Sequence, residues 1–456
     1  MARSIARLLD AWRPLPPLFD PRHPRFRRTF ACFWGLLFSW CLIIHALAGH
    51  WLTTWQSPDM HAEPVRIAKS LIEHGTFANP FFPLPTGPTA HIGPLYPALY
   101  AALWAMFGSG RALWLSIRIV TVAAWALQWA MLPGLALKLG IPVRAGLIAA
   151  AIGAMLPMPG SCFKTEAIFT GLILVLLCYA VARARELPAL ATYMAISVLA
   201  GIGLLISPTI LVVLLPWLFV LLDPDARMRS WGVRVIPVAA AIVLIVSPWL
   251  VRNYRIFHAV FLVRDNFGTE LAISNNDCAS PWADEGRNSG CASETHPNGN
   301  RVLAEQVRDL NEYRFNQKQE RLAVAWIRSH PARFIQLTAA RILYFWVPPI
   351  SLASGGFARV NAFVSSLLSV LAAIGLVLMA RRASYGFWML LPCFVLFPLV
   401  HYVVQVELRY RYPILWAILI AAAYAICTAS SHWRAATSSP DASALYGQPR
   451  LSIPRA

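Results

Sequence analysis

The sequence predicts an all-α polytopic membrane protein, and two observations carry this prediction. The chain of 456 residues is 58% hydrophobic and only 13% charged, with a mean hydropathy of +0.55, whereas a soluble domain carries about 25% charged residues. The net charge of +18 comes mainly from arginines that stand between long apolar runs. This distribution is typical of the basic connections of a membrane protein, so no nucleic-acid partner is expected.

About ten transmembrane helices are expected. The predicted spans are 31–52, 113–137, 145–160, 166–182, 189–206, 208–222, 235–251, 359–380, 385–404 and 413–431. A helix perpendicular to the bilayer needs about 20 residues, so several spans are short, and the region 189–222 could divide differently around Pro208. The sequence shows no clear internal repeat.

The basic residues predict that both termini are cytoplasmic. Residues 1–30, with seven Arg and two Asp, form a basic inner N-terminus, and a disordered inner tail covers 432–456. Every predicted inner connection is basic, through Lys138, Arg144, Arg183, Arg185, Arg227, Arg229, Arg234, Arg381 and Arg382. Ala46-Leu47-Ala48 resembles a signal-peptidase site, but the long basic start favours an uncleaved anchor.

Two large outer loops are predicted. The first, 53–112, belongs to an N-terminal transmembrane module (31–251) and holds an interfacial or re-entrant helix at 94–108. The second, 252–358, precedes a C-terminal module (359–431). Its twelve basic and ten acidic residues predict a folded insertion. Within it, 301–330 is predicted to be helical, and 332–348 to stay at the interface, because charged groups are costly at the bilayer centre.

The eight cysteines divide into two groups. Six lie in or beside apolar spans and are expected to pack as small apolar side chains. Cys278 and Cys291 lie in the second outer loop and could form a disulfide in an oxidising compartment. No Cys/His spacing indicates a structural zinc site.

Acidic residues of the first outer loop are the first candidates for chemistry. Pro64 favours the start of a helix, so Glu63 is predicted to be the N-cap of an amphipathic helix that ends near His74. A capping carboxylate is one interpretation of Glu63, and a general base that deprotonates a hydroxyl is the other. Asp59, four residues earlier, is the reserve candidate.

Further charged residues stand at the outer ends of spans. Glu166 follows Lys164 at the start of the fourth span, and the two could be a simple ion pair or part of a site. Arg409 and Arg411 precede the last span, on the side where insertion does not favour arginine. A guanidinium there is suited to phosphate; lipid head groups or loop acids are the alternative partners.

Several loop residues are weaker candidates. Arg252 and Arg264, with Asn275-Asn276 beyond them, could line a polar binding site. His91, Tyr96 and His296 are also candidates, although a lone histidine more often has a structural role. By contrast, the cores of most predicted spans contain no Asp, Glu, Lys or Arg. Because ion-coupled transporters keep ionisable groups at mid-depth, the pattern favours chemistry at the outer face.

These segments together resemble the membrane-embedded GT-C glycosyltransferases, the superfamily of protein O-mannosyltransferases and lipid A aminoarabinose transferases. The similar segments run in order over most of the chain: Glu63-Pro-Val-Arg66-Ile-Ala68, Gly87–His91 with Pro94–Pro97, Arg252–Tyr254, Arg264–Glu270, Asn275-Asn276 and Glu407–Arg411. The resemblance implies a GT-C-like bundle with two large extracytoplasmic loops that bear interfacial helices. The sequence differs from many relatives in having Glu63-Pro64 where they have Asp or Asp-Glu.

The resemblance further implies an inverting enzyme of the inner membrane that takes a sugar from a polyprenyl-phosphate carrier. Glu63 and Glu166 match the family's two acidic positions, Asp59 is displaced upstream and stays the reserve candidate, and Arg66 stands three positions after Glu63 as in relatives. Arg409 and Arg411 match the arginines that hold the carrier phosphate, and Lys164 is expected to assist them. The expected acceptor is a glycan, a lipid or a protein. Membrane lipids are further expected partners of the chain. Relatives include metal-dependent and metal-independent enzymes; no ligand set is evident here, so a divalent metal stays open.

The leading hypothesis is therefore transfer of a hexosyl or pentosyl unit to a hydroxyl group at the outer face, with Glu63 as base. A lipid-carrier flippase or another transporter is the alternative, and it requires a continuous polar path through the bundle. A non-catalytic scaffold is the third interpretation, in which the candidate residues share no site.

Overall fold

The computed structural model describes residues 18–48, 61–156, 158, 160–220, 229–352 and 356–437. Within these residues all regular structure is helical, apart from two isolated β-bridges. The all-α prediction is thereby confirmed for the described part of the chain. Asp59, residues 1–17 of the predicted N-terminal segment and residues 438–456 of the predicted tail lie outside the described residues.

Seven predicted spans coincide with helices that are long and apolar enough to cross a membrane. They are α2 (Phe26–Ala48), α5 (Arg111–Lys138), α7 (Ala167–Glu186), α10 (Arg229–Phe257), α17 (Gly356–Arg381), α18 with α19 (Tyr385–Val395 and Leu399–Val403), and η3 with α20 (Leu408–Ile414 and Leu415–Thr437). The protein is thus a multi-pass membrane protein. The helix α20 extends six residues beyond the predicted end of its span at 431.

Three further predicted spans form shorter apolar helices: α6 (Val143–Met155), α8 (Leu190–Ile206) and α9 (Ile210–Val220). The chain between α8 and α9 turns at Ser207 and Pro208, because proline lacks the N–H that would continue the helix. These helices are too short to span a bilayer at right angles, so the number of ten spans stays a prediction.

The two predicted outer loops contain short helices. The first holds α3 (Glu63–His74) and α4 (Leu95–Phe107), which pack together through Val65, Ala68, Tyr96 and Tyr100. The second holds α11 (Phe267–Ser274), α12 (Ala283–Asn288), α13 (Cys291–Thr295), α14 (Arg301–Leu310), α15 (Glu312–Ser329) and α16 (Pro331–Trp346). The predicted single helix at 301–330 is broken at Asn311, whose φ of 67° is left-handed.

The N-cap prediction for Glu63 is wrong by one residue. Ala62 has extended backbone angles and its carbonyl accepts hydrogen bonds from Val65 and Arg66, so it caps the helix and Glu63 is the first helical residue. Pro64 follows without needing a donor, as expected for the first turn. The carboxylate of Glu63 therefore still lies at the positive end of the helix dipole.

The core of the bundle forms around α20, whose residues Leu415 to Ala425 are all buried. Small residues allow close approach of neighbouring helices. A Cβ added to Gly375 of α17 would lie 1.9 Å from the carbonyl oxygen of Ala421, so these two helices meet backbone to backbone. The face of α20 that packs against α17, α6 and α5 is apolar, and α20 also contacts η3.

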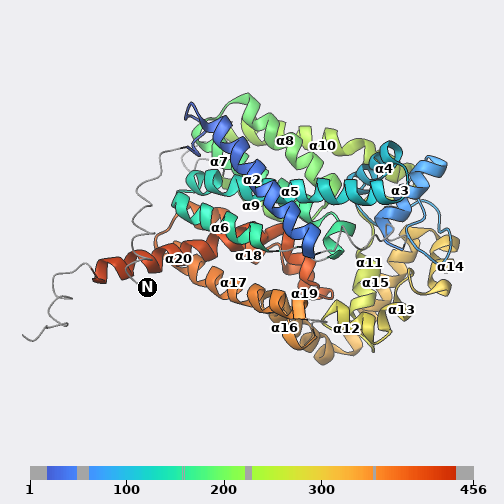
Figure 1. Ribbon diagram of the computed structural model, residues 1–456. Coiled ribbons are helices and arrows are strands. Elements are labelled where there is room, and N and C mark those ends of the chain that lie inside the picture. The colour runs from blue at the N-terminus through green and yellow to red at the C-terminus, as the bar shows by residue number, and fades with distance from the viewer. Residues whose placement is uncertain are drawn as a thin grey trace, which may run out of the picture.

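The helices of the two outer loops gather at one end of the bundle (Figure 1). At the opposite end lie the start of α2 and the ends of α5 and α7, where Lys138 and Arg22 both contact the carboxylate of Glu186, at 2.5 and 3.6 Å. Segments predicted to share one side of the membrane therefore lie together. The end that holds the helices of the two outer loops is called the loop end, and the end that holds Lys138, Arg22 and Glu186 is called the basic end. The predicted site residues of the two outer loops belong to the loop end.

Candidate functional site

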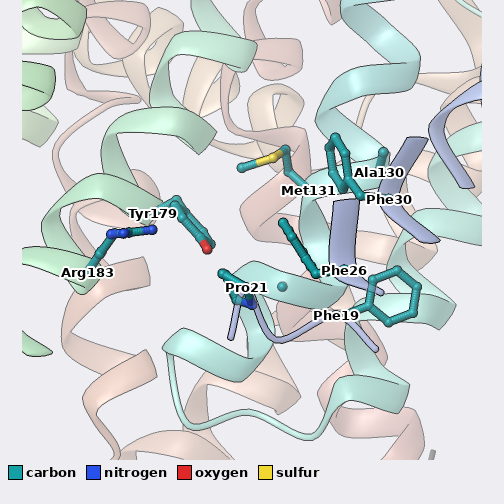
Figure 2. A pocket seen from close by; sticks show the side chains of 9 residues that line it. Phe19, Pro21, Phe26, Phe30, Ala130, Met131, Tyr179 and Arg183 are labelled. Atoms are coloured by element: carbon teal, nitrogen blue, oxygen red, sulfur yellow. The ribbon is translucent and has the colours of Figure 1, made fainter. Parts of the chain in front are cut away.

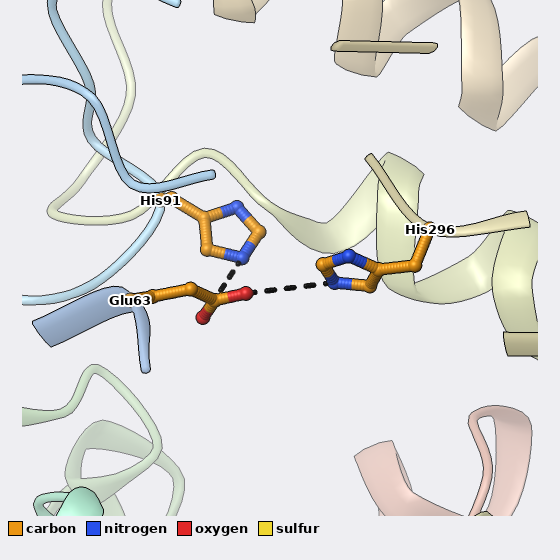
Figure 3. A group of neighbouring side chains, drawn as sticks. All are labelled: Glu63, His91 and His296. Atoms are coloured by element: carbon orange, nitrogen blue, oxygen red, sulfur yellow. Dashed lines mark ion pairs between the residues drawn. The ribbon is translucent and has the colours of Figure 1, made fainter. Parts of the chain in front are cut away.

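Glu63, His91 and His296 converge at the loop end of the bundle (Figure 3). Glu63 Oε2 lies 3.5 Å from Nε2 of His91, and Glu63 Oε1 lies 3.6 Å from Nε2 of His296. Glu63 begins α3, His91 stands in the loop between α3 and α4, and His296 directly follows α13. The imidazole of His91 is buried, while Glu63 and His296 keep about one fifth of their side-chain surface exposed.

The charges of this cluster are coupled. Burial alone would raise the pKa of Glu63, but the charges of His91, His296 and Arg409 outweigh burial and hold it at about 2. Burial would lower the pKa of His91, but the negative charge of Glu63, followed by those of Glu312 and Glu270, outweighs burial and raises this pKa to about 9. At His296 burial prevails and its pKa is lowered. Glu63 is therefore a carboxylate at neutral pH, and a weaker base than the sequence hypothesis assumed.

The backbone around His91 is held mainly by residues of the second loop. The buried carboxylate of Glu312 accepts hydrogen bonds from the Thr89 hydroxyl and from the Ala90 N–H, the latter at 2.6 Å. Thr89 Oγ1 in turn accepts from the N–H of His91 at 2.9 Å. Because these bonds fix three successive residues, Glu312 sets the position of the His91 ring.

Two predicted site arginines bind the same loop. Arg264 Nε donates to the carbonyl of His91 at 3.1 Å, and its Nη1 pairs with Glu166 at 2.8 Å. Arg252 donates to the carbonyls of Thr89 and Phe77, at 2.7 and 2.9 Å. Arg264 thus joins Glu166 to the His91 loop, and Arg252 holds the backbone of the same loop two residues before His91.

His296 is positioned by two links. The Cys278–Cys291 disulfide, which the sequence left open, fixes the start of α13. Asn298 donates its N–H to His296 Nδ1 at 2.9 Å, accepts from the N–H of Phe82 at 2.8 Å, and donates to the carbonyl of His61 at 3.2 Å. Asn298 therefore connects the His296 turn to both sides of the first loop.

Arg409 approaches the cluster from η3. Its Nε lies 2.9 Å from Glu407 Oε2, although the N–H direction does not make a hydrogen bond, and Glu407 also pairs with Arg287 at 3.4 Å. The Arg409 side chain keeps 27% of its surface exposed, and its charge contributes to the lowered pKa of Glu63. A partly exposed cation therefore lies within electrostatic range of the Glu63 cluster.

Comparison with known proteins gives solved structures only, because no family model and no curated protein matches the sequence. The archaeal oligosaccharyltransferase AglB from Archaeoglobus fulgidus, in complex with an inhibitory peptide and a dolichol-phosphate, has a TM-score of 0.54 and 16% identity over 94% of this chain. Structures of the A. fulgidus oligosaccharyltransferase in the apo form (0.54, 16%, 93% of this chain) and with Zn and sulfate (0.53, 16%, 89%) are also similar. These enzymes belong to the GT-C superfamily. The chain has the GT-C fold.

The resemblance found in the sequence is thereby confirmed at the level of the fold. The chain spans about half of the archaeal enzymes, 53% of the first two structures and 50% of the third. At the loop end of this GT-C fold the structure brings together Glu63, His91 and His296, with Arg409 beside them. Glu166 joins this group through Arg264.

Two other predicted site residues, Arg411 and Tyr96, direct their hydrogen bonds not to the Glu63 cluster but to protein groups elsewhere in the GT-C fold. The Arg411 guanidinium is buried among α16 and α17, where it donates to the Ser369 hydroxyl at 2.6 Å and to the carbonyl of Ser365 at 3.2 Å. The buried Tyr96 hydroxyl donates to the carbonyl of Phe163 at 3.0 Å. Both bind protein groups within the fold, because a buried donor needs a nearby acceptor.

Two other predicted site residues are Arg66 and Lys164. Arg66 lies one turn after Glu63, with its guanidinium 5.7 Å from the centre of the Phe82 ring. Lys164 is exposed at the end of η1 (Gly160–Lys164), two residues before Glu166. Glu166 pairs with Arg264 at 2.8 Å, so its carboxylate has a partner in the second outer loop.

The cluster of Glu63, His91 and His296 also offers a set of metal ligands. Two imidazoles and one carboxylate suit a catalytic zinc ion. Separations of 3.5 and 3.6 Å exceed hydrogen-bond distances and suit ligand atoms that share one ion at about 2.0–2.2 Å. His296 Nδ1, however, accepts a hydrogen bond, whereas a metal-bound histidine usually donates from its second nitrogen. Metal binding at Nε2 therefore requires the proton to move to Nδ1 and the contact with Asn298 to break.

Sequence reasoning missed Glu312, placed Asp265 only within the Arg264–Glu270 segment without a role of its own, and ranked His296 low. Glu312 is one of ten acidic residues in its loop, and nothing local separates it from the solvated ones. Asp265 Oδ2 is buried without a hydrogen-bond partner, and its N–H donates to the Ala90 carbonyl. Burial, together with Glu312, raises the pKa of Asp265 to about 8.

Replacing Asp265 with Asn is expected to stabilise the protein increasingly between pH 4 and pH 8. The folded state holds a proton on Asp265 up to about pH 8, while the unfolded carboxyl loses it near pH 4. The wild type therefore loses stability over this interval, and the neutral Asn does not. Thermal unfolding in detergent at pH 5, 7 and 8.5 measures the difference. A gain that is equal at all three pH values would show that charge is not its cause.

Proposed function

We propose that this protein is a glycosyltransferase that moves one sugar from a polyprenyl-phosphate carrier to an acceptor hydroxyl at the outer face of the inner membrane. The convergence of Glu63, His91 and His296 beside Arg409, on a GT-C fold, is the observation that carries the proposal. Support for the donor class comes from the archaeal neighbour, whose structure holds a dolichol-phosphate and a peptide. The acceptor class stays open among glycan, lipid and protein.

The loop end is proposed to be extracytoplasmic. The basic connections of the opposite end agree with cytoplasmic insertion bias. The Cys278–Cys291 disulfide supports this orientation, because such bonds persist in oxidising compartments. Both termini are then cytoplasmic. The apolar core around α20 gives no support to a polar transport path.

Glu63 is proposed to receive the acceptor hydroxyl. A carboxylate with a pKa of about 2 is a weak base before reaction, but the hydroxyl becomes more acidic as its oxygen bonds to the anomeric carbon. Glu63 then accepts the proton while the bond to the carrier phosphate breaks. Attack from the face opposite the leaving group inverts the anomeric configuration, which NMR of the product would show.

Arg409 is proposed to stabilise the departing phosphate, with Lys164 nearby. A fixed cation is most useful where negative charge develops. Arg411 is left out of this proposed role, because its donors are used inside the bundle.

Glu63, His91 and His296 would hold a divalent ion, if one binds. When bound, such an ion supplies a positive charge that polarises an oxygen ligand of the substrate. The protein residues around it would keep part of their roles: Glu312 holds the His91 loop, and Asn298 still bonds to Phe82 and His61 once its contact with His296 Nδ1 is broken. These contacts orient the three side chains toward one point.

Deletion of the protein in its own organism tests the proposed function. Mass spectrometry of lipid extracts should show that one polyprenyl-phosphate sugar accumulates, while the envelope glycans or lipids lose that sugar. Complementation with the wild-type chain should restore both. A deletion strain in which carrier and acceptor are both unchanged would reject the proposal. Carrier trapped in the inner leaflet would instead favour the transport hypothesis.

Replacing Arg409 with Gln should lower kcat at least tenfold, because one charge-assisted contact to the leaving phosphate is lost. Arg409→Lys should recover part of it. The matched control is Arg255→Gln, an exposed arginine at the end of α10. Transfer from a purified polyprenyl-phosphate sugar in detergent measures the effect. A kcat loss as large in the control would assign the effect to general charge.

A further inference from the structure

A cavity lies at the basic end of the molecule, opposite the candidate site (Figure 2). It has a volume of about 250 Å³ and lies between the N-terminal segment, α5 and α7. Its lining residues are Phe19, Pro21, Phe26, Phe30, Ala130, Met131, Gly134, Tyr179 and Arg183. Seven of these nine residues are apolar, so water has few hydrogen-bonding partners inside the cavity.

Only Tyr179 and Arg183 bring polar groups to this cavity. Both stand on α7, one turn apart, and Figure 2 shows the Tyr179 hydroxyl and the Arg183 guanidinium directed toward the open space. The cavity therefore has an apolar interior and one cation at its edge.

The surroundings of the cavity are rich in positive charge. The exposed arginines Arg22, Arg25, Arg27 and Arg28 belong to the same N-terminal segment whose aromatic side chains line it. The nearby acid Glu186 already has two cationic partners, Lys138 and Arg22. Clusters of arginine beside a transmembrane helix attract anionic lipid head groups.

The helix that closes the cavity faces the lipid. Only 11% of the apolar window of α2 is buried inside the protein, so this span lies at the edge of the bundle. Most of α2 is therefore available to contact acyl chains of the bilayer, beside the cavity that it lines through Phe26 and Phe30. An apolar space with a guanidinium at its edge matches the two chemical parts of a phospholipid.

We propose that this cavity binds one anionic phospholipid, with an acyl chain among the aromatic side chains and its phosphate on Arg183. The lipid would join α2 and its N-terminal segment to α5 and α7. Binding at this end is independent of the proposed transferase activity, because the cavity lies away from Glu63 and its partners.

Native mass spectrometry of the full-length protein tests the proposal. The wild type is released from mixed vesicles of phosphatidylglycerol and phosphatidylcholine, and one phosphatidylglycerol should stay bound. Arg183→Gln should reduce this retained species about tenfold. The control is Arg185→Gln on the same helix, whose guanidinium instead lies 4.5 Å from the Tyr385 ring; it should retain the lipid as the wild type does.

A second variant tests the apolar part. Met131→Trp fills the cavity and should remove the bound lipid while Arg183 is intact. Thermal unfolding of each variant shows whether it is folded. Equal retention of phosphatidylglycerol and phosphatidylcholine by the wild type, equal loss in Arg183→Gln and Arg185→Gln, or unchanged retention in Met131→Trp would each overturn the proposal.

Discussion

Replacing Glu63 with Gln is expected to reduce sugar transfer by about a thousandfold or more, with little change in folding. The carboxylate is the negative centre of the cluster: both imidazoles lie within 3.6 Å of it, and the charge of Arg409 also lowers its pKa. Gln has the same shape but cannot take up the proton of the acceptor hydroxyl, and a missing proton acceptor costs about 10²–10⁴ in rate. Loss of the charge that faces His91 adds to this effect.

The matched control for Glu63 stands on the same helix. Glu73 is exposed and pairs with Lys69 of the same helix at 3.7 Å. Glu73→Gln should therefore transfer sugar at the wild-type rate. Both variants should carry the Cys278–Cys291 disulfide and unfold within a few degrees of the wild type. Wild-type turnover by Glu63→Gln would remove Glu63 from the proposed mechanism.

Replacing His296 with Ala is expected to abolish stoichiometric zinc binding and to lower transfer at least a hundredfold. Three ligands hold an ion far better than two, and zinc sites that react with substrate normally have three protein ligands. The wild type, dialysed against zinc and desalted, should retain about one ion per chain by elemental mass spectrometry. His74→Ala, at the exposed end of α3, is the control for loss of a surface histidine.

The absence of bound zinc in the wild type would also be informative. If the wild type retains no zinc and a chelator leaves transfer unchanged, the cluster acts through direct charge pairing of Glu63 with the two histidines. The hydrogen bond from Asn298 to His296 Nδ1 would then persist and keep the proton on Nε2. In that case His296→Ala should lower transfer without any change in metal content.

The fold was largely predictable from local sequence, because bilayer insertion imposes a strong pattern. Long apolar runs and the arginines between them located all seven of the longer spans. Where a run was short or divided by proline, as at Pro208, the pattern could not say whether one helix crosses or two helices meet. The buried Arg341 shows another limit: its charge is satisfied by Asn275 and by the carbonyl of Val403, partners that no local pattern predicts.

The candidate site was predictable only in part, because its members come from distant segments. Glu63 has a local signal, since an acid beside Pro64 starts an amphipathic helix. Arg409 and Arg411 carry the same signal, yet one borders the cluster and the other is buried against α17. Two residues apart in a 3₁₀ segment they point in different directions, and only the packing of η3 decides which one is exposed. His296 had no signal beyond its residue type.

The contacts of Asn298 have a consequence for biogenesis. This side chain bonds to positions 237 and 216 residues earlier in the chain, at His61 and Phe82. Since translation runs from the N-terminus, the ribosome has already produced several apolar helices before His296, the second histidine partner of Glu63, exists, and Arg409 is made later still. A nascent or prematurely terminated chain would thus be embedded in the membrane without a complete candidate site.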